Sequence, residues 1–357
     1  MTSRINRLRT SLASSDIDAL YVTHLVNIRY LSGFTGSSGL LLVTPETARL
    51  YVDSRYHVQA EQQTSGVEVC RCQSRLTAEA WDDIKTLAPE RIGFEATHIT
   101  VAAHEDLAKG IPGSTLVPVR NLIEELRLVK DEDEIAITRR ACAMADELFE
   151  WLLGFIKPGM CEQDVDVELE YQMRKRGAQG PAFPSIIVSG VNSSKPHGTP
   201  SSKVIETGDF ITMDFGVRLD GYNSDITRTV AVGKADDKQR EVYEVVRKAQ
   251  AAAVEALRPG IGHLEADAVA RDIITEAGYG PKFGHALGHS LGLDVHDGYR
   301  LSNVTDPEGK VQQGEIWTVE PGIYIEDWGG VRIEDDVLVT ADGSERLTKS
   351  TRELIII

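Results

Sequence analysis

Five short motifs in the second half of the chain each hold a candidate carboxylate or imidazole ligand in a segment that contains glycine. The motifs are ITMDFG, GYNSDITRT, FGHALGHSLGL, WTVEPG and GGVRIEDD, and their candidate metal-binding residues are Asp214, Asp225, His289, Glu320 and Glu334. Buried carboxylates repel one another and lose their hydration, so four of them cannot share an interior without a compensating cation. A fold that gathers these residues therefore requires a metal site.

Residues 209–232 predict two antiparallel strands joined at Asp220-Gly221. Apolar residues occupy one parity of the first strand and polar residues, including Asp214, occupy the other, as in a half-buried strand. An Asp-Gly pair favours a two-residue mirror-image turn, which fixes the register of the pairing. This register sets Leu219 opposite Tyr222, Asp214 opposite Thr227, and Gly216 opposite Asp225. The two aspartates then share one face at a Cα separation of roughly 7–8 Å, which suits two carboxylates that share two metal ions.

Glu320 and Glu334 flank a second predicted hairpin. If its loop has an odd number of residues centred on Asp327, the two glutamates lie directly opposite each other. Pro321 weakens this expectation, because proline donates no ladder hydrogen bond and tends to end strand pairing. A single acidic residue on a strand is typical of a solvated surface, and a lone histidine is typical of a structural position. Five such positions in order, two of them paired by a turn, favour a metal centre instead.

These motifs resemble those of the pita-bread metallopeptidases, and within that family the Xaa-Pro aminopeptidases and the Xaa-Pro dipeptidases (prolidases). The resemblance rests on MDFG, SDITRT, GHALGHSLGLDVH, TVEPGIY and GGVRIEDD in that order. Two earlier segments, YLSGFTGSSG at 30–39 and VDSRYHVQA at 52–60, are similar to the amino-terminal domain of short bacterial members. The resemblance covers essentially the whole chain, and no ligand position departs from the family pattern.

The resemblance implies two divalent metal ions. It assigns one ion to Asp225, His289, Glu320 and Glu334, and the second to Asp214, with Asp225 and Glu334 bridging. Oxygen-rich ligation with one imidazole favours Mn²⁺, with Co²⁺, Fe²⁺ and Zn²⁺ as alternatives. Two ions would lower the pKa of a bridging water and polarise the scissile carbonyl. Glu320 is also assigned as the general base, which passes the water's proton to the leaving nitrogen.

Four further residues are assigned to the active site. His197 in KPHG and His296 in GLDVHD resemble histidines of the family that surround the metal ligands, and imidazole donors stabilise charge on the substrate carbonyl. His285 is assigned to the substrate pocket, because the glycines around it disfavour a helical pair of ligands with His289. Arg332 is assigned to substrate binding or to orienting a carboxylate through a bidentate contact. A loop histidine, a core histidine and a surface ion pair are the respective structural alternatives for His197, His296 and Arg332.

Composition excludes other kinds of partner. A net charge of −17 over 357 residues argues against nucleic acid or an anionic membrane. No apolar run reaches the roughly 18 residues of a membrane helix. The first 20 residues predict an amphipathic helix and not a signal sequence, so a cytoplasmic protein is expected. The four cysteines are too scattered for a disulfide framework.

Length and pattern predict two domains. Residues 1–126 alternate helix and strand patterns, which predicts a small α/β domain with strands near 19–22, 39–43, 48–52, 91–94 and 115–118. Asp131 and Glu134 form a capping pattern that opens a long helix ending at Pro158-Gly159. Residues 127–357 predict an α+β domain, with helices near 162–176, 238–257 and 264–277 and strands at 184–190, 209–217, 222–232, 315–320 and 331–339. The resemblance implies a creatinase-like first domain and a pita-bread second domain.

Three functions fit the sequence. An Xaa-Pro aminopeptidase would remove the first residue from peptides whose second residue is proline, whereas an Xaa-Pro dipeptidase would accept only dipeptides. The short FTGSSG-type amino-terminal domain favours the aminopeptidase. A non-catalytic binding module on the same fold is disfavoured, because the five ligands and both histidines are present. The resemblance also implies a homo-oligomer, a dimer or larger, that acts on proline-containing peptides.

Overall fold

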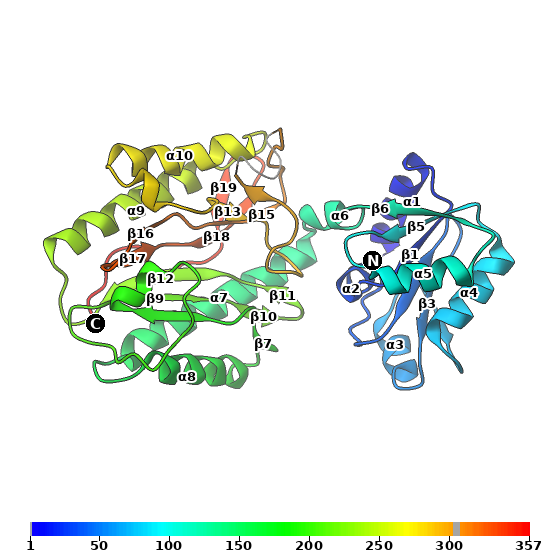
Figure 1. Cartoon of the computed structure of the whole chain (residues 1–357), viewed down its shortest axis with the longest axis horizontal. Helices are drawn as coiled ribbons and strands as arrows, with labels where there is room; N and C mark the ends of the chain where they lie inside the picture. The colour runs from blue at the N-terminus through cyan, green and yellow to red at the C-terminus, as the bar shows by residue number, and fades with distance from the viewer. Residues whose placement is uncertain (1, 303–307) are drawn as a thin grey trace. The chain divides into compact units, whose positions relative to one another are not determined.

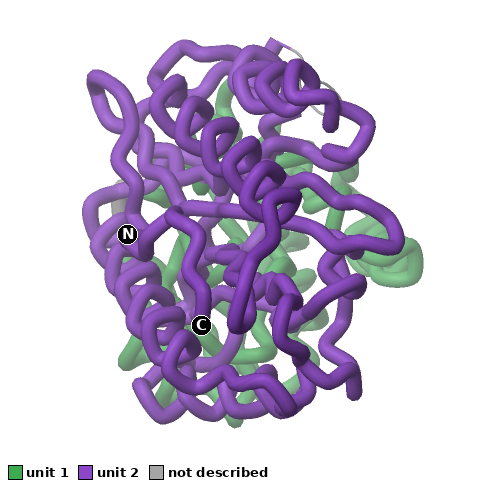
Figure 2. Tube along the Cα trace, turned by 90° about the vertical axis from the view of Figure 1, so that its left-hand side faces the viewer, with its two compact units in different colours: residues 1–127 green, residues 128–357 purple. Residues whose placement is uncertain are grey.

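The computed structural model of the chain describes residues 2–302 and 308–357. These residues form two compact units that divide between Arg127 and Leu128 (Figure 2). Each unit has its own β-strands and its own buried hydrophobic clusters, as expected of independent domains. Within the described ranges, no helix is long and apolar enough to cross a membrane.

The first unit is a six-stranded sheet with helices packed on it (Figure 1). The strand order is β4-β3-β2-β1-β5-β6, with β1 (Ala19–Val22), β2 (Leu40–Val43), β3 (Ala48–Val52), β4 (Glu68–Arg71), β5 (Arg91–Glu95) and β6 (Thr115–Val119). Strands β1, β2 and β3 pair antiparallel, whereas β4, β5 and β6 run parallel to their neighbours. The predicted α/β class is confirmed.

The helices of the first unit are α1 (Thr2–Ser14), α2 (Leu25–Ser32), α3 (His57–Gln63), α4 (Leu76–Leu87), α5 (Val101–Gly110) and α6 (Glu124–Leu128). The predicted amphipathic helix at the start is confirmed, because Ile5, Leu8 and Leu12 are all buried. Helices α2, α5 and α6 were not predicted. Each is short, and tertiary packing, more than local propensity, stabilises helices of this length.

In the described part of the second unit, four α-helices enclose antiparallel strands. The helices are α7 (Glu132–Phe155), α8 (Glu162–Lys175), α9 (Asp237–Ala256) and α10 (His263–Glu276). Figure 1 shows α9 and α10 on one side of the strands and α7 and α8 on the other. The predicted cap of the long helix α7 is confirmed, since Asp131 and Glu134 each accept a hydrogen bond from the other's backbone N–H.

The strands of this unit are β7 (Gly180–Pro181), β8 (Ile186–Ser189), β9 (Phe210–Phe215), β10 (Val217–Leu219), β11 (Tyr222–Asn223), β12 (Ile226–Ala231), β13 (Gly288–His289), β14 (Arg300–Leu301), β15 (Ile316–Val319), β16 (Gly322–Ile325), β17 (Gly329–Arg332), β18 (Asp335–Val339) and β19 (Ser344–Arg346). All of the strand pairs between them are antiparallel. The predicted α+β class is confirmed.

The first predicted hairpin forms with the predicted register, but its strands are not continuous. Asp220 and Gly221 have φ values of 47° and 81°, as a mirror-image turn requires. Leu219 pairs with Tyr222 and Asp214 pairs with Thr227. The prediction of unbroken strands at 209–217 and 222–232 is wrong, because both strands divide where Gly216 faces Asp225. A Cβ on Gly216 would lie 1.9 Å from the Ser224 carbonyl oxygen, so this close approach of two backbones requires glycine.

The second hairpin divides in the same way. Val319 pairs with Asp335 and Gly322 pairs with Arg332, so the two ladders share one register. Asp327 lies at the centre of the three-residue loop that the register predicts, with φ of 59°. The prediction of one strand at 331–339 is wrong, because the chain leaves the ladder between β17 and β18, opposite Pro321.

Strand β9 is buried along both of its faces, so the expectation of a half-buried strand is wrong. Ile211, Met213 and Phe215 belong to a hydrophobic cluster with residues of α7 and α8, as the apolar parity predicts. The polar parity does not face water, because the second hairpin packs across it through β17. The two hairpins therefore enclose a polar interior between them.

Candidate active site

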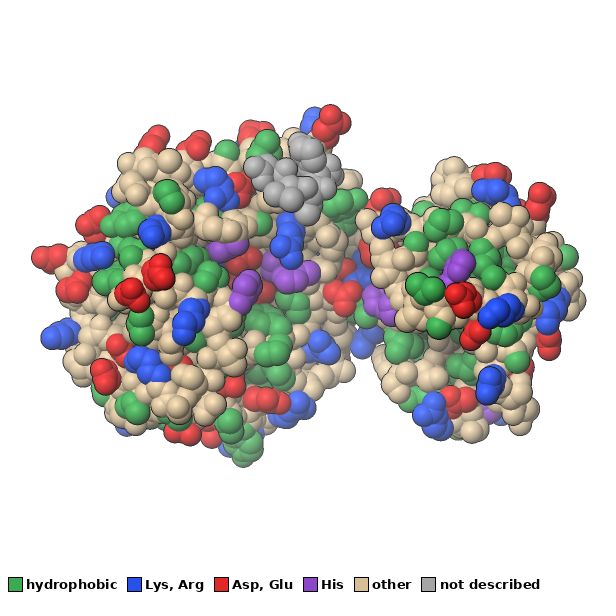
Figure 3. Space-filling model, in the orientation of Figure 1, with side chains coloured by type: hydrophobic (Ala, Val, Ile, Leu, Met, Phe, Trp, Pro, Cys, Tyr) green, Lys and Arg blue, Asp and Glu red, His purple; other side chains and the backbone are tan. Residues whose placement is uncertain are grey.

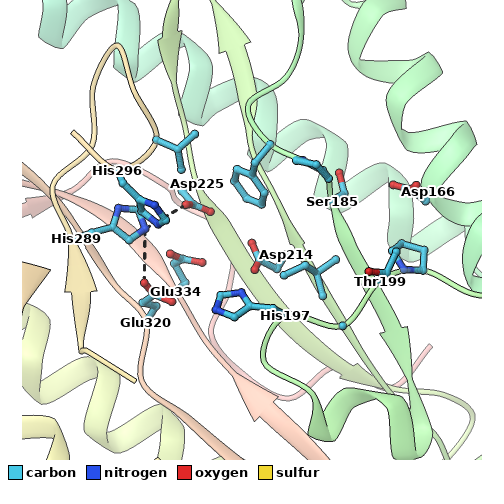
Figure 4. Close-up of a pocket in the computed structure, with 16 residues that line it drawn as sticks. Asp166, Ser185, His197, Thr199, Asp214, Asp225, His289, His296, Glu320 and Glu334 are labelled. Atoms are coloured by element: carbon cyan, nitrogen blue, oxygen red, sulfur yellow. Dashed lines mark ion pairs between the residues drawn. The ribbon is translucent and has the colours of Figure 1, made fainter. Parts of the chain in front are cut away.

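The structure brings all five predicted metal-binding residues to one cavity of about 480 Å³ (Figure 4). Asp225, His289 and Glu334 each offer a donor atom, and these three atoms lie within 4.8 Å of one another. The His289 Nε2 atom is 3.7 Å from Asp225 Oδ2 and 3.6 Å from Glu320 Oε1. Asp214 lines the same cavity. The cavity also contains the two predicted catalytic histidines, and Figure 3 shows histidine side chains grouped on this unit's surface.

Where the ladders are interrupted, backbone N–H groups form hydrogen bonds that connect the ligand-bearing segments to one another. The Glu334 N–H donates to the Thr227 carbonyl of the first hairpin at 3.0 Å. The Glu320 N–H donates to the carbonyl of Leu287, close to His289, at 2.8 Å. The Asp225 N–H donates to the Asp336 carboxylate at 2.8 Å. Buried amides need partners, so these bonds compensate for the lost ladder pairing and fix the ligands' backbones relative to one another.

His289 is presented as a neutral ligand with a defined tautomer. Its Nδ1 atom lies 3.2 Å from the Ser290 carbonyl, an acceptor only, so Nδ1 carries the proton and Nε2 offers its lone pair to the cavity. Burial lowers the pKa of His289 to about 3. The backbone N–H of His289 donates to Thr318 Oγ1 at 3.0 Å, and the Thr318 hydroxyl donates to Glu320 Oε1 at 3.4 Å. Thr318 thus links two of the candidate ligands.

Arg332 and Thr227 orient two of the acidic side chains through hydrogen bonds. The Arg332 guanidinium, which is 3% exposed, donates to Asp214 Oδ2, to Thr227 Oγ1 at 3.0 Å and to the Tyr324 hydroxyl at 2.7 Å. The Thr227 hydroxyl in turn donates to Glu334 Oε2 at 2.6 Å. One oxygen of Asp214 and one of Glu334 are therefore fixed, which directs the other oxygen of each toward the cavity.

The chemistry of this site fits divalent cations. The Oδ1 atoms of Asp214 and Asp225 are buried and make no hydrogen bond in the described part of the chain. Burial raises the pKa of Glu320 to about 8 and raises the pKa values of Asp225 and Glu334 well above the usual range. Unpaired buried carboxylate oxygens beside a neutral imidazole are an arrangement that cations stabilise.

The predicted catalytic histidines and substrate-binding residues lie around these carboxylates. His197 and His296 both line the cavity, and the His296 ring meets the His289 ring edge-on at 4.2 Å. His285 and Arg332 line a smaller adjoining cavity of about 100 Å³. The Nε2 atom of His285 lies 2.9 Å from the Tyr324 hydroxyl, and burial lowers the pKa of His285 to about 4.

Several residues that support the site were not predicted from the sequence. The register predicts Thr227 as the cross-strand partner of Asp214, but it predicts no role for the Thr227 hydroxyl. Tyr324, Thr318 and Asp336 stand within or beside the motifs, but their contacts depend on segments distant in sequence. Asp166 of α8 also lines the cavity and belongs to none of the motifs.

A second group of potential ligands in the first unit has a structural explanation. His24, Glu95 and Glu124 offer atoms within 4.8 Å of one another. Glu95 Oε2 accepts hydrogen bonds from the Thr23 and His24 N–H groups, at 2.7 and 2.8 Å, at the start of α2. Asn27 donates to Glu95 Oε1 at 2.8 Å and to Glu124 at 2.7 Å. Because these donors already satisfy the Glu95 carboxylate, the group stabilises a helix terminus.

Known proteins share this fold. Residues 136–341 match metallopeptidase family M24, and residues 4–129 match the creatinase/prolidase N-terminal domain. The chain is similar to an Xaa-Pro dipeptidase of Pyrococcus horikoshii, with 40% identity over 357 residues and coverage of 99% of each chain.

Solved structures give the same result. One described as an Xaa-Pro dipeptidase from Bacillus anthracis has a TM-score of 0.97 and 42% identity, over 99% of both chains. An X-Pro aminopeptidase from Thermotoga maritima has a TM-score of 0.92 and 35% identity, over 98% of this chain and 100% of that one. With its creatinase-type amino-terminal domain and its pita-bread catalytic domain, the chain belongs to metallopeptidase family M24.

Proposed function

We propose that this protein is a metal-dependent Xaa-Pro dipeptidase. The observation that carries the proposal is the convergence of the Asp225, His289 and Glu334 donor atoms within 4.8 Å, in a cavity large enough for a dipeptide. Proline specificity is inferred from the relatives, several of which are named as Xaa-Pro dipeptidases or prolidases. The aminopeptidase that the amino-terminal domain favoured becomes the second candidate, supported by the likeness to the Thermotoga maritima enzyme.

The five residues that line the cavity would hold two divalent ions. Asp225, His289, Glu320 and Glu334 would bind one ion, and Asp214 would bind the other, with Asp225 and Glu334 shared. Mn²⁺ suits this oxygen-rich set best, with Co²⁺, Fe²⁺ and Zn²⁺ as alternatives. When bound, the ions would supply Lewis acidity and make hydroxide available near neutral pH.

Protein side chains would move the protons and orient the substrate. Glu320 serves as general base, since it lines the cavity beside the other candidate ligands and would take the water's proton and pass it to the leaving nitrogen. His197 and His296 serve as donors to the scissile carbonyl oxygen from the cavity wall. Burial lowers the pKa of His296, so the neutral ring is the donor.

We propose that His285 and Arg332 bind the substrate where it enters the smaller cavity. Both line it, and Tyr324 joins them, because its hydroxyl contacts the His285 ring and the Arg332 guanidinium. Arg332 also acts indirectly, because it orients the Asp214 carboxylate. We further propose a cytoplasmic homodimer, as the family resemblance implies. Peptides are its proposed partners, since the net charge of −17 suits neither nucleic acid nor an anionic membrane.

The test is hydrolysis of Ala-Pro beside Ala-Pro-Ala by the Mn²⁺-loaded protein, with a chelated sample as control. Cleavage of the dipeptide alone supports the dipeptidase. Cleavage of the tripeptide as well establishes the aminopeptidase instead. If neither peptide is cleaved in a metal-dependent manner, the proline-specific function is wrong.

A further inference from the structure

We propose that Asp166 makes the cavity selective for substrates whose residue before proline has a cationic side chain. The inference rests on the proposed peptidase function and names the substrate class for it. Asp166 lies on α8 and lines the same cavity as the candidate ligands. Figure 4 shows it beyond Ser185 and Thr199, on the side of the cavity away from His289 and Glu320.

Among the described residues, the Asp166 carboxylate has no counter-charge. It makes no hydrogen bond or ion pair with the residues that the structure describes. Burial raises its pKa, and the negative charge of Glu170, one helical turn away, raises it further. Arg174, which follows Glu170 by one further turn of α8, is paired with Glu170 at 2.9 Å. A half-buried carboxylate beside another acid gains from any cation that enters the cavity.

The charges at the other end of the cavity are accounted for separately. Asp214 is paired with Arg332, and the remaining carboxylates there belong to the proposed metal set. Asp166 stands apart from that set, so bound metal ions would not serve as its partner (Figure 4). A cationic group of the substrate is the counter-charge that the cavity lacks.

Electrostatic repulsion and side-chain length decide which part of the substrate supplies this cationic group. A carboxy-terminal proline carries a carboxylate, which Asp166 would repel. The substrate's α-amino group is one carbon from the scissile carbonyl, so it stays near the metal-binding residues. The side chain of the residue before proline is free to extend across the cavity, and in lysine or arginine it ends in a positive charge.

The rest of the cavity lining suits such a side chain. Phe183, Pro184, Ile186 and Pro200 give the cavity apolar walls. Lysine and arginine pack their methylene stems on apolar surface and keep the charged group at a polar site. Ser185 and Thr199 lie beside Asp166 and add hydroxyl oxygens that accept hydrogen bonds from an ammonium or guanidinium group.

The test compares kcat/KM for Lys-Pro and Met-Pro, whose first side chains are similar in length and differ in charge. The full-length Mn²⁺-loaded protein is assayed as wild type, as Asp166→Asn and as Asp164→Asn. We expect Asp166→Asn to lower the Lys-Pro to Met-Pro ratio about tenfold, since it removes a half-buried charge partner. Asp164 lies exposed on the same helix and outside the cavity lining, so its substitution should leave the ratio unchanged.

A charge reversal gives an independent check. Asp166→Lys should raise kcat/KM for Glu-Pro relative to Lys-Pro. An unchanged Lys-Pro to Met-Pro ratio in Asp166→Asn, or an equal loss on both substrates, overturns the inference while metal-dependent Met-Pro cleavage leaves the peptidase function standing. If the wild type cleaves neither dipeptide, the proposed function fails, and the specificity of Asp166 fails with it.

Discussion

Glu320 lies directly opposite Glu334, at a position where neither residue belongs to a β-ladder. The ladders on both sides share one register, so the interruption changes the hydrogen bonding of the two backbones without shifting their alignment. Their amides bind the first hairpin and the segment before His289 instead. The same interruption recurs where Gly216 faces Asp225. Asp225, Glu320 and Glu334 therefore stand where ladder pairing gives way to contacts between segments, whereas Asp214 and His289 lie within paired strands.

Removing the carboxylate of Asp225 should abolish metal binding. Asp225→Ala is expected to lose both ions on dialysis and to reduce Ala-Pro hydrolysis at least 1000-fold, on the order of the contribution of a metal-activated water. Metal content is measured by inductively coupled plasma mass spectrometry. Asp342→Ala, at an exposed position, is the control. Full metal content in Asp225→Ala would show that Asp225 does not bridge the ions.

His197 should affect the rate and not the metal. His197→Ala removes a donor on the cavity wall that belongs to no proposed ligand set. We expect unchanged metal content and a fall in kcat of about 100-fold, typical of losing one donor to a developing oxyanion. Steady-state kinetics with a parallel metal assay decides this. Metal loss in step with activity would reassign His197 as a ligand.

Thr227 tests how the ligands are oriented. Thr227→Val keeps the shape but removes the hydroxyl that donates to Glu334 and accepts from Arg332. Metal affinity should fall by about 10- to 100-fold, as is typical when a group that orients a ligand is lost. Thr227→Ser retains the hydroxyl and should bind metal like the wild type. Equal affinities for all three proteins, measured by competition with a chelating dye, would contradict the assigned role.

Gly216 should be intolerant of any side chain. Its Cβ would lie 1.9 Å from the Ser224 carbonyl oxygen, so Gly216→Ala must move one backbone of the hairpin. We expect a destabilisation of about 3 kcal/mol, typical of a severe steric conflict in a packed interior. Gly154→Ala is the matched control, because that glycine lies in α7 with no heavy atom close to the new Cβ. This change should stabilise the protein by roughly 0.5–1 kcal/mol. Urea denaturation measures both, and equal values would contradict the prediction.

Stability without metal should depend on pH. Burial raises the pKa of Glu320 from 4.5 to about 8, so the folded metal-free chain holds a proton that the unfolded chain releases. Stability from this group is present below about pH 4.5 and is lost as the pH rises toward 8. Bound cations replace the proton. We therefore expect Mn²⁺ to raise Tm more at pH 8 than at pH 6, by thermal denaturation with and without chelator; equal shifts would contradict this.

The local geometry of each hairpin follows from the sequence. Asp220-Gly221 specifies a mirror-image turn, and the register that results sets Asp214 opposite Thr227. The register about Asp327 likewise sets the two glutamates opposite each other. The cap at Asp131 and Glu134 fixes the start of α7. These features depend on residues close to one another in the sequence, so the local sequence is enough to define them.

Tertiary packing decided what the site contains beyond those residues. The docking of one hairpin on the other buries the polar face of β9, interrupts the ladders and turns Arg332 toward Asp214. It also places Tyr324 between Arg332 and His285. These contacts join segments as much as 118 residues apart. Hydrophobic periodicity records which face of a strand is apolar, but it does not identify what covers the other face. The sequence by itself determined the candidate ligands and their pairing within each hairpin, whereas only the packing of the two hairpins decided how they converge and which side chains hold them.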